Sequence, residues 1–261
     1  MTDAYAAAGV DTHAGDLAVE LMKRAVGATH NDMVVGGLGG FAGMMDVSFL
    51  KNYDRPLLAT STDGVGTKVA IAQIIDKHDT IGQDLVGMVV DDIVVVGAKS
   101  LFMTDYIACG KVVPQRIADI VRGIAEACAS VGVALVGGET AEHPGLLGPD
   151  DYDVAGAAVG VVDAAKLLGP QKVKAGDVVL GMQSSGLHSN GYSLVRRIVE
   201  RNSRDRQRRR HVLGPRLVVD GVRLHPSPAR NRIGRQVREL EDPAGGDQAA
   251  GSHVLGEARH P

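Results

Sequence analysis

The sequence predicts a mixed α/β fold, in which helices pack on a four-stranded sheet. Short apolar runs alternate with longer segments of helical periodicity, and 34 glycines and 10 prolines in 261 residues separate them. Hydrophobic residues make up 44% of the chain, which is enough for a large core. We expect an N-terminal domain over 1–165, the incomplete start of a second α/β domain over 166–200, and an irregular tail over 201–261.

Two helices in the first part of the chain are predicted from apolar spacing. The first covers 11–26, and its side chains available for packing are Leu17, Val19, Leu21 and Met22. The second follows Thr80, a plausible cap, and extends to about Val96. In the second helix an apolar residue recurs every four positions, and these residues should face the core: Ile81, Leu85, Val89 and Ile93.

The strands are predicted from short apolar runs that turn residues bound. In order, these runs cover 56–60, 101–108, 133–136 and 154–162. Pro114, at a first-turn position, opens a helix between the second and third strands, and this helix ends near Val131. A further strand over 177–182, after the Gly176 turn, would begin the second domain.

The composition changes near residue 200. Residues 1–200 contain 15 basic and 24 acidic side chains, whereas residues 201–261 contain 13 Arg, no Lys and 7 acidic side chains. The tail lacks Met, Phe and Tyr, and its opening run over 204–211 has no apolar face to bury. Three explanations stay open: translation in the wrong reading frame, a natural disordered extension, or a basic segment that binds nucleic acid, which we favour least.

Other features favour a cytoplasmic protein without a membrane segment. No apolar run approaches the roughly 20 residues that a membrane helix needs. Residues 1–5 have neither the basic nor the apolar part of a secretory signal. Both cysteines, Cys109 and Cys128, lie in apolar surroundings without metal-ligand spacing, which is typical of reduced core thiols.

The strongest chemical signal is the run from Ser61 to Lys68, between a predicted strand and a helix. Gly64 and Gly66 allow backbone N–H groups to turn towards phosphate oxygens. Lys68 supplies a mobile positive charge, and Asp63 offers the oxygen ligands that magnesium prefers. The spacing is not that of a P-loop, and a tight strand-to-helix turn with a surface lysine is the structural alternative.

Asp63 to Lys68 resembles the signature of the aminoimidazole ribonucleotide synthetase family. Three further blocks are similar to family blocks and follow in the family's order, over 36–41, 137–142 and 185–192. The agreement is nearly continuous from Tyr5 to Ile198, and the region after about residue 200 does not match. Four ordered motifs with matching spacers make this resemblance highly specific.

Acidic residues are candidate ligands of a nucleotide or a metal. Asp84 and Asp91 share a helix face, with Asp92 beside it, and could gather metal ions around a triphosphate; a solvated acidic face is the alternative. Asp105 interrupts an apolar strand, which a structural salt bridge explains as well as ligand binding does. Glu139 lies at a strand end, where α/β sheets place ligands, and could contact a nucleotide or a metal; a buried hydrogen-bonded glutamate is the alternative.

The resemblance implies an enzyme of purine biosynthesis, in which formylglycinamidine ribonucleotide and ATP give aminoimidazole ribonucleotide, ADP and phosphate. It implies a homodimer whose sheets pair across the interface, and a glycine-rich lid over the nucleotide. Magnesium would lie on Asp63, Asp91 and Asp92. Catalytic roles would fall to Asp92, His188 and Asn190. The nucleotide-binding residues implied are Gly36, Gly37, Gly39, Gly40, Asp63, Gly64, Gly66, Thr67, Lys68, Asp105, Gly137, Gly138 and Glu139.

Two alternatives stay open. Selenophosphate synthetase, thiamine-phosphate kinase and the larger amidotransferase that precedes this step use the same scaffold, although the block over 187–190 favours the cyclo-ligase. A chain with an incomplete second domain could also be an inactive remnant that retains ATP binding or dimerisation. We expect the 261-residue chain to be poorly soluble or inactive.

Overall fold

The computed structural model describes residues 10–37, 39–40 and 42–213, with side chains as far as Asn202. The chain divides into two units, Met1–Gln207 and Arg208–Pro261. Every element below belongs to the first unit, except for the end of the last helix. The expectations about residues 214–261 lie outside the described residues and stay predictions.

Four strands form one mixed sheet in the order β3-β6-β4-β5. The edge strand β3 (Pro56–Gly64) is antiparallel to β6 (Tyr152–Asp163), and β6 is antiparallel to β4 (Lys99–Cys109). β4 is parallel to β5 (Ala134–Glu142), which forms the other edge. All four predicted strands are confirmed. Most are longer than the runs that predicted them, because polar and glycine-rich residues continue the hydrogen-bonded ladder at the strand ends.

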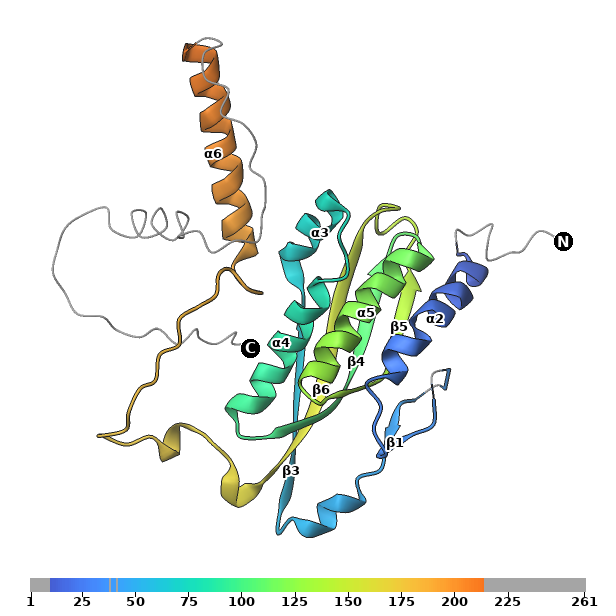
Figure 1. Cartoon of the computed structure of the whole chain (residues 1–261), viewed down its shortest axis with the longest axis vertical. Coiled ribbons are helices and arrows are strands. Elements are labelled where there is room, and N and C mark those ends of the chain that lie inside the picture. Colours follow the sequence, from blue (N-terminus) through green and yellow to red (C-terminus); the bar gives the residue numbers. More distant parts are fainter. Residues whose placement is uncertain (1–9, 38, 41, 214–261) are drawn as a thin grey trace. The chain divides into compact units, whose positions relative to one another are not determined.

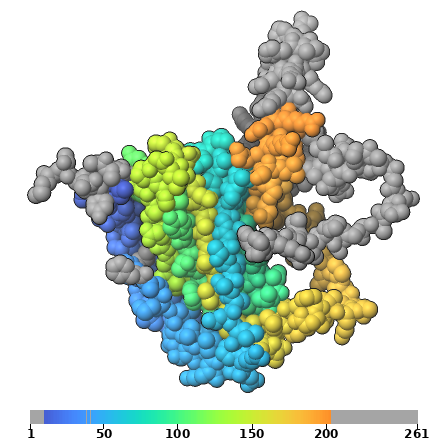
Figure 2. Space-filling view, turned by 180° about the vertical axis from the view of Figure 1, so that it is seen from behind, coloured from blue at the N-terminus to red at the C-terminus, as the bar shows by residue number. Residues whose placement is uncertain are grey.

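Three helices cover one face of the sheet (Figure 1): α2 (Thr12–Gly27), α4 (Ile81–Val95) and α5 (Pro114–Ser130). α5 packs between α2 and α4, and α4 contacts β3 and β6. The opposite face is open: in Figure 2, which views the molecule from behind, the lime, yellow and blue-green atoms of β5, β6 and β3 lie at the surface. The short helix α3 (Val69–Ile75) precedes α4.

The predicted core face of α4 is confirmed. Ile81, Leu85, Val89 and Ile93 are all buried, as the four-residue spacing requires. Thr80 precedes the helix as expected, but its side chain makes no capping hydrogen bond. The spacing therefore predicted the orientation of this helix correctly, and with it the positions of the acidic residues on its other side.

The predicted packing face of α2 is wrong for three of its four residues. Leu17, Val19 and Leu21 are exposed, and only Met22 is buried. The face that packs is formed by residues four apart: Ala18, Met22 and Val26. Small Ala18 allows α2 to approach its neighbours closely, which a choice by side-chain size does not reveal.

Helices α4 and α5 meet through glycines. A Cβ atom on Gly82 would lie 2.1 Å from the backbone nitrogen of Ile124, and one on Gly123 would lie 2.2 Å from the carbonyl oxygen of Asp79. The two backbones therefore touch where α4 begins. This contact fixes the start of α4, the helix that carries Asp84, Asp91 and Asp92, against α5.

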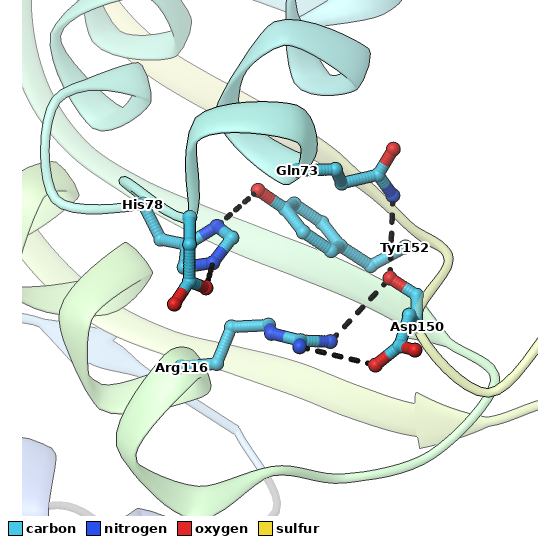
Figure 3. A network of polar contacts seen from close by, with 6 residues as sticks. Gln73, His78, Arg116, Asp150 and Tyr152 are labelled. Carbon is cyan, nitrogen blue, oxygen red and sulfur yellow. Dashed lines mark hydrogen bonds and ion pairs between the residues drawn. The ribbon is translucent and has the colours of Figure 1, made fainter.

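A polar network also holds the start of α4 (Figure 3). His78 Nδ1 lies 2.8 Å from the Tyr152 hydroxyl, and His78 Nε2 lies 3.0 Å from Asp76 Oδ1. Gln73 and Arg116 both donate to the carbonyl oxygen of Asp150. Burial raises the pKa of Tyr152 to about 12. The network ties the α3–α4 connection to the first residue of β6 and to α5.

The strand predicted over 177–182 is absent from the described structure. Residues 177–182 form an irregular segment whose apolar side chains, Val178, Val179, Leu180 and Met182, are largely exposed. A strand needs a neighbour for its N–H and C=O groups, and no described segment pairs with this one. The last element, α6 (Tyr192–Leu213), extends the helical chain into the first residues of the expected tail. None of the described helices has the length and apolarity to cross a bilayer.

Candidate functional site

The cavity beside α4 gathers the acidic and lysine residues that the sequence singles out. It has a volume of about 740 Å³ and is lined from the end of β3, from α4 and from residues 187–190. Asp63 and Lys68 lie on one side, and Asp91 and Asp92 lie on the helix. His188 and Asn190 also line it. The structure therefore brings together six residues for which the sequence predicted metal, phosphate or catalytic roles.

Lys68 is held at the centre of this cavity. Its Nζ atom lies 2.7 Å from Asp84 Oδ1 and donates to the carbonyl oxygen of His188 at 3.0 Å. The same ammonium group lies 4.8 Å from the centre of the Tyr192 ring, in a cation–π contact. Asp84 is buried, so this ion pair is screened much less than a surface pair. Lys68 thus lines the cavity with its ammonium group held in place by these contacts.

Asp84 is a site residue to which the sequence assigned no individual role. It accepts from Lys68 and, at 3.2 Å, from the Ser189 hydroxyl. The sequence feature that pointed to Asp84 was its seven-residue separation from Asp91, which places both side chains on one face of the helix. Through this hydrogen bond Ser189 connects residues 187–190 to α4. Nearby, the hydroxyls of Thr67 and Ser193 lie 3.0 Å apart, which adds a second link.

The three predicted magnesium ligands differ in their surroundings. Asp92 Oδ2 accepts from the Ser61 hydroxyl at 2.9 Å, and Asp63 Oδ1 accepts from the backbone N–H of Gly64 at 2.7 Å. Within the described residues, no three acidic, histidine or cysteine side chains already converge as a metal cage. Magnesium usually binds one or two carboxylates together with phosphate oxygens and water, so this donor set fits it without a preformed cage.

The glycine-rich segment and Asp105 lie at a second cavity, of about 380 Å³. Gly37, Gly39 and Gly40 border it, in the connection between β1 (Val34–Val35) and β2 (Met44–Met45). Gly36 and Gly39 have φ values of 90° and 107°, which favour glycine. Asp105 and, from β5, Gly137, Gly138 and Glu139 complete the predicted residues there. The residues expected around one nucleotide are therefore divided between two cavities.

The register of the sheet explains this division. Asp63, Gly156, Asp105 and Gly138 are opposite one another on adjacent strands and form a row. Since neighbouring strands are about 4.8 Å apart, the two aspartates are separated by roughly 10 Å. A Cβ atom on Gly156 would lie 2.9 Å from Met103 Cε and 3.2 Å from Leu85 Cδ2. These apolar side chains fill the space between the carboxylates.

Asp105 has none of the partners that the salt-bridge alternative required. It is only 9% exposed, and no described residue forms an ion pair with it. Burial raises the pKa of its carboxyl to about 7, and hydrogen bonding to its own backbone N–H partly opposes that rise. Oδ1 occupies the space that a side chain at Gly138 would need, because a Cβ atom there would be 2.2 Å away. Asp105 is therefore a buried acid at the wall of a cavity.

Replacing Asp105 with Asn is expected to stabilise the protein at pH 7 and above. The folded-state pKa of about 7 exceeds the ordinary value of 3.8, so the folded chain keeps a proton that the unfolded chain loses as the pH rises between these values. The free energy of unfolding of the unmodified protein therefore falls between these pH values, by at most on the order of 4 kcal/mol. The amide in Asp105→Asn does not titrate, so the variant does not lose this stability. Urea unfolding at pH 5 to 8 gives the free energy of unfolding of both proteins. A difference between them that stays constant over this pH range would contradict the expectation.

Glu142 has a structural role within its block. Its Oε1 accepts from the backbone N–H of Val112 at 2.6 Å, and its Oε2 accepts from that of Asp11 at 2.7 Å. It thereby joins β5 to the turn before α5 and to the start of α2. Glu139, three residues earlier, faces the second cavity instead. Glutamates in one block thus have different roles.

Comparison with known proteins gives two matches to family models. Residues 42–162 match the model "AIR synthase related protein, N-terminal domain", and residues 174–246 match its C-terminal counterpart. The second match extends beyond residue 200, whereas the motif resemblance found in the sequence ends near that residue. The linker between the two matches includes the irregular chain that follows β6.

Curated relatives agree with these matches. The chain is 55% identical over 199 residues to phosphoribosylformylglycinamidine cyclo-ligase of Geobacillus thermodenitrificans, and 56% identical over 199 residues to that of Geobacillus kaustophilus. Each alignment covers 76% of this chain and 57% of the relative, so the chain spans a little over half of their length. Among solved structures, E. coli HypE, a hydrogenase maturation protein, matches 62% of this chain and 47% of its own, with 18% identity and a TM-score of 0.47.

Proposed function

The chain belongs to the AIR synthase related protein family, and from this premise we propose that it serves the ATP-dependent cyclo-ligase reaction named for its relatives. In that reaction formylglycinamidine ribonucleotide closes its five-membered ring to give aminoimidazole ribonucleotide, while ATP becomes ADP and phosphate. The observation that supports this most directly is the cavity in which Lys68 lies among Asp63, Asp84, Asp91 and Asp92. Its charges suit a magnesium-bound triphosphate.

The chemistry requires a leaving group to be made from an amide oxygen. An amide carbonyl is a poor electrophile, and transfer of the γ-phosphoryl group to its oxygen makes that oxygen leave as phosphate when the amidine nitrogen attacks. The protein's part is mainly positioning and charge stabilisation. Asp63, Asp91 and Asp92 would hold magnesium, which neutralises charge on the triphosphate. Gly64 and Gly66 leave room for phosphate oxygens beside the backbone.

Lys68 changes partner in this proposal. Asp84 and the His188 carbonyl hold its ammonium group in the cavity before nucleotide binds. A triphosphate offers a higher negative charge than one carboxylate, so Lys68 would turn towards it. His188 and Asn190 line the same cavity, where they would bind the substrate phosphate or assist proton transfer. His188 Nε2 lies 2.8 Å from the Ser185 hydroxyl, which orients its ring.

We also propose a cytoplasmic homodimer that forms through the open face of the sheet. Thr60, Val159 and Phe102 are opposite one another in the register and lie on the face that the helices leave uncovered. Leu58 and Tyr106 are exposed on the same strands. A second copy would cover these side chains, which favours sheet-to-sheet contact. Both cysteines are free and buried, which suits a reducing compartment.

The test is to incubate the purified 261-residue chain with formylglycinamidine ribonucleotide and Mg·ATP, and to follow the aminoimidazole product and ADP together. The proposal expects both to appear in equal amounts, and only when magnesium is present. ADP without aminoimidazole would indicate another member of the superfamily. Binding of ATP without either product would identify a nucleotide-binding remnant, and a monomer in sedimentation experiments would contradict the homodimer.

A further inference from the structure

Asp84 is the carboxylate of the cavity beside α4 that has no role in the proposed function beyond holding Lys68. Its side chain is only 8% exposed and lines the cavity. Oδ1 accepts from the Lys68 ammonium group at 2.7 Å and from the Ser189 hydroxyl at 3.2 Å. In the part of the chain that the structure describes, Oδ2 accepts no hydrogen bond. One oxygen of this buried carboxylate is therefore unused.

The unused oxygen is open to the cavity. Buried acceptors in folded proteins nearly always have a donor, and Ser100 Oγ is the side-chain atom of the described residues that is enclosed without one. Asp84 Oδ2 is not enclosed, and Asp84 lines the cavity, so a ligand can reach this atom. A carboxylate oxygen accepts about two hydrogen bonds and donates none. The group that fits Oδ2 is therefore an N–H or O–H donor from a ligand.

Magnesium fits this oxygen less well than an N–H donor does. The Lys68 ammonium group lies on the same carboxylate, and its positive charge would repel a divalent ion bound beside it. Asp91 and Asp92, the predicted metal ligands on α4, lie roughly 10 to 12 Å further along the helix, at a rise of about 1.5 Å per residue. Magnesium–oxygen distances are about 2.1 Å. Asp84 therefore lies outside the ligand shell of an ion held by those two residues.

From these observations we infer that Asp84 Oδ2 binds the amidine group of the substrate and selects it against the corresponding amide. An amidine presents an N–H group where an amide of the same shape presents a carbonyl oxygen. The N–H group donates to Oδ2, whereas the carbonyl oxygen would face Oδ2 without a proton between them. A site built to bond such a group rejects the analogue that lacks it. The inference rests on the proposed function, because formylglycinamidine ribonucleotide is the substrate that carries the amidine.

The charges and neighbours of Asp84 support this assignment. The cavity lining contains four carboxylates and one lysine, so it attracts a cation such as a protonated amidine. Ser189 donates to Oδ1 and lies between His188 and Asn190 in the chain. A substrate held by those two residues would therefore lie beside Asp84. When Lys68 turns towards a nucleotide, the amidinium group would replace it as the partner of the buried carboxylate, which is costly to leave unpaired.

The experiment measures the binding of acetamidinium to the whole chain by protein NMR titration at pH 7.5, with acetamide as the neutral probe of the same shape. We expect saturable shifts of the backbone amides of residues 84–91 and 187–190 with acetamidinium, and an affinity about tenfold lower or more for acetamide. Asp84→Asn should weaken acetamidinium binding by about tenfold or more, because a neutral amide is a poorer acceptor for a cation. Asp54→Asn, which removes an exposed acid before β3, is the matched control and should change the affinity less than about twofold.

Lys68→Gln separates this role from general damage to the cavity. Loss of the ammonium group frees Oδ1 of Asp84 and removes a repelling charge, so acetamidinium should bind about threefold more tightly or better. Disruption of the cavity would instead weaken binding in both Lys68→Gln and Asp84→Asn. Magnesium chloride at equal ionic strength should leave acetamidinium bound. Displacement of the probe by magnesium would place the metal on Asp84 and overturn the inference.

Three other results would also overturn it: equal affinity for the two probes, unchanged acetamidinium binding by Asp84→Asn, or weaker binding by Lys68→Gln. These titrations require neither ATP nor turnover. Failure of the whole chain to form the aminoimidazole product would therefore count against the proposed function and not against the site at Asp84. Product formation by a chain that binds both probes equally would count against this site alone.

Discussion

Asp63→Asn is expected to lower the magnesium-dependent affinity for ATP by on the order of 100-fold or more. The substitution removes one of the carboxylates that would hold the metal, and an amide oxygen is a much weaker ligand for a hard cation. The fold should not change, because the Asp63 side chain is exposed and accepts a hydrogen bond from the adjacent N–H of Gly64. Calorimetric titration with ATP, with and without magnesium, measures the effect.

Asp54→Asn is the matched control for this experiment. Asp54 is an exposed acid just before β3, whereas Asp63 lies at the other end of that strand. Both substitutions remove one negative charge, so a general electrostatic effect would appear in both proteins. Only Asp63→Asn should lose the magnesium dependence. If it bound Mg·ATP as tightly as Asp54→Asn, the metal assignment would be wrong.

Gly82→Ala is expected to destabilise the protein by about 3 kcal/mol or more. The new methyl group would lie 2.1 Å from the backbone nitrogen of Ile124, and backbone can move only if α4 and α5 separate. Gly123→Ala should have a similar effect, because its Cβ would lie 2.2 Å from the carbonyl oxygen of Asp79. Urea unfolding followed by circular dichroism gives the free energy of unfolding of each variant.

Gly87→Ala provides the comparison on the same helix. Nothing lies within 4 Å of a Cβ atom at Gly87. This substitution should therefore stabilise α4 by roughly 0.5 to 1 kcal/mol, since alanine loses less backbone freedom than glycine on folding. If Gly82→Ala were as stable as Gly87→Ala, the close approach of the two helices would not exist in solution.

The sequence predicted the elements better than it predicted their packing. In α4, the four-residue spacing of Ile81, Leu85, Val89 and Ile93 identified residues that are all buried. In α2, apolar residues occur on several sides, so only the contact with α5 decides that Ala18 and Val26 are buried while Leu17 is exposed. The strand expected over 177–182 was wrong because alternation and apolarity do not supply a pairing partner.

The candidate site shows the same limit. Local motifs identified Asp63, Lys68 and Asp105 as chemically unusual, and each lies at a cavity. The register across β6 decides which of these residues share a cavity, because Gly156 lies between Asp63 and Asp105 in the sheet. That register joins segments about 90 residues apart in the chain and has no local signal. The pairing of Lys68 with Asp84 is likewise a tertiary contact.

The strand order has a consequence for how the chain can be synthesised. β6 is the last strand of the described sheet to leave the ribosome, yet it lies between β3 and β4, and β3 pairs with no other strand of that sheet. The nascent chain must therefore keep β3 unpaired while roughly 90 further residues emerge. Only then can the sheet close around its central strand. Until that moment the segment that carries Asp63 is an open template for unwanted strand pairing, which makes this interval the one in which a chaperone would matter most.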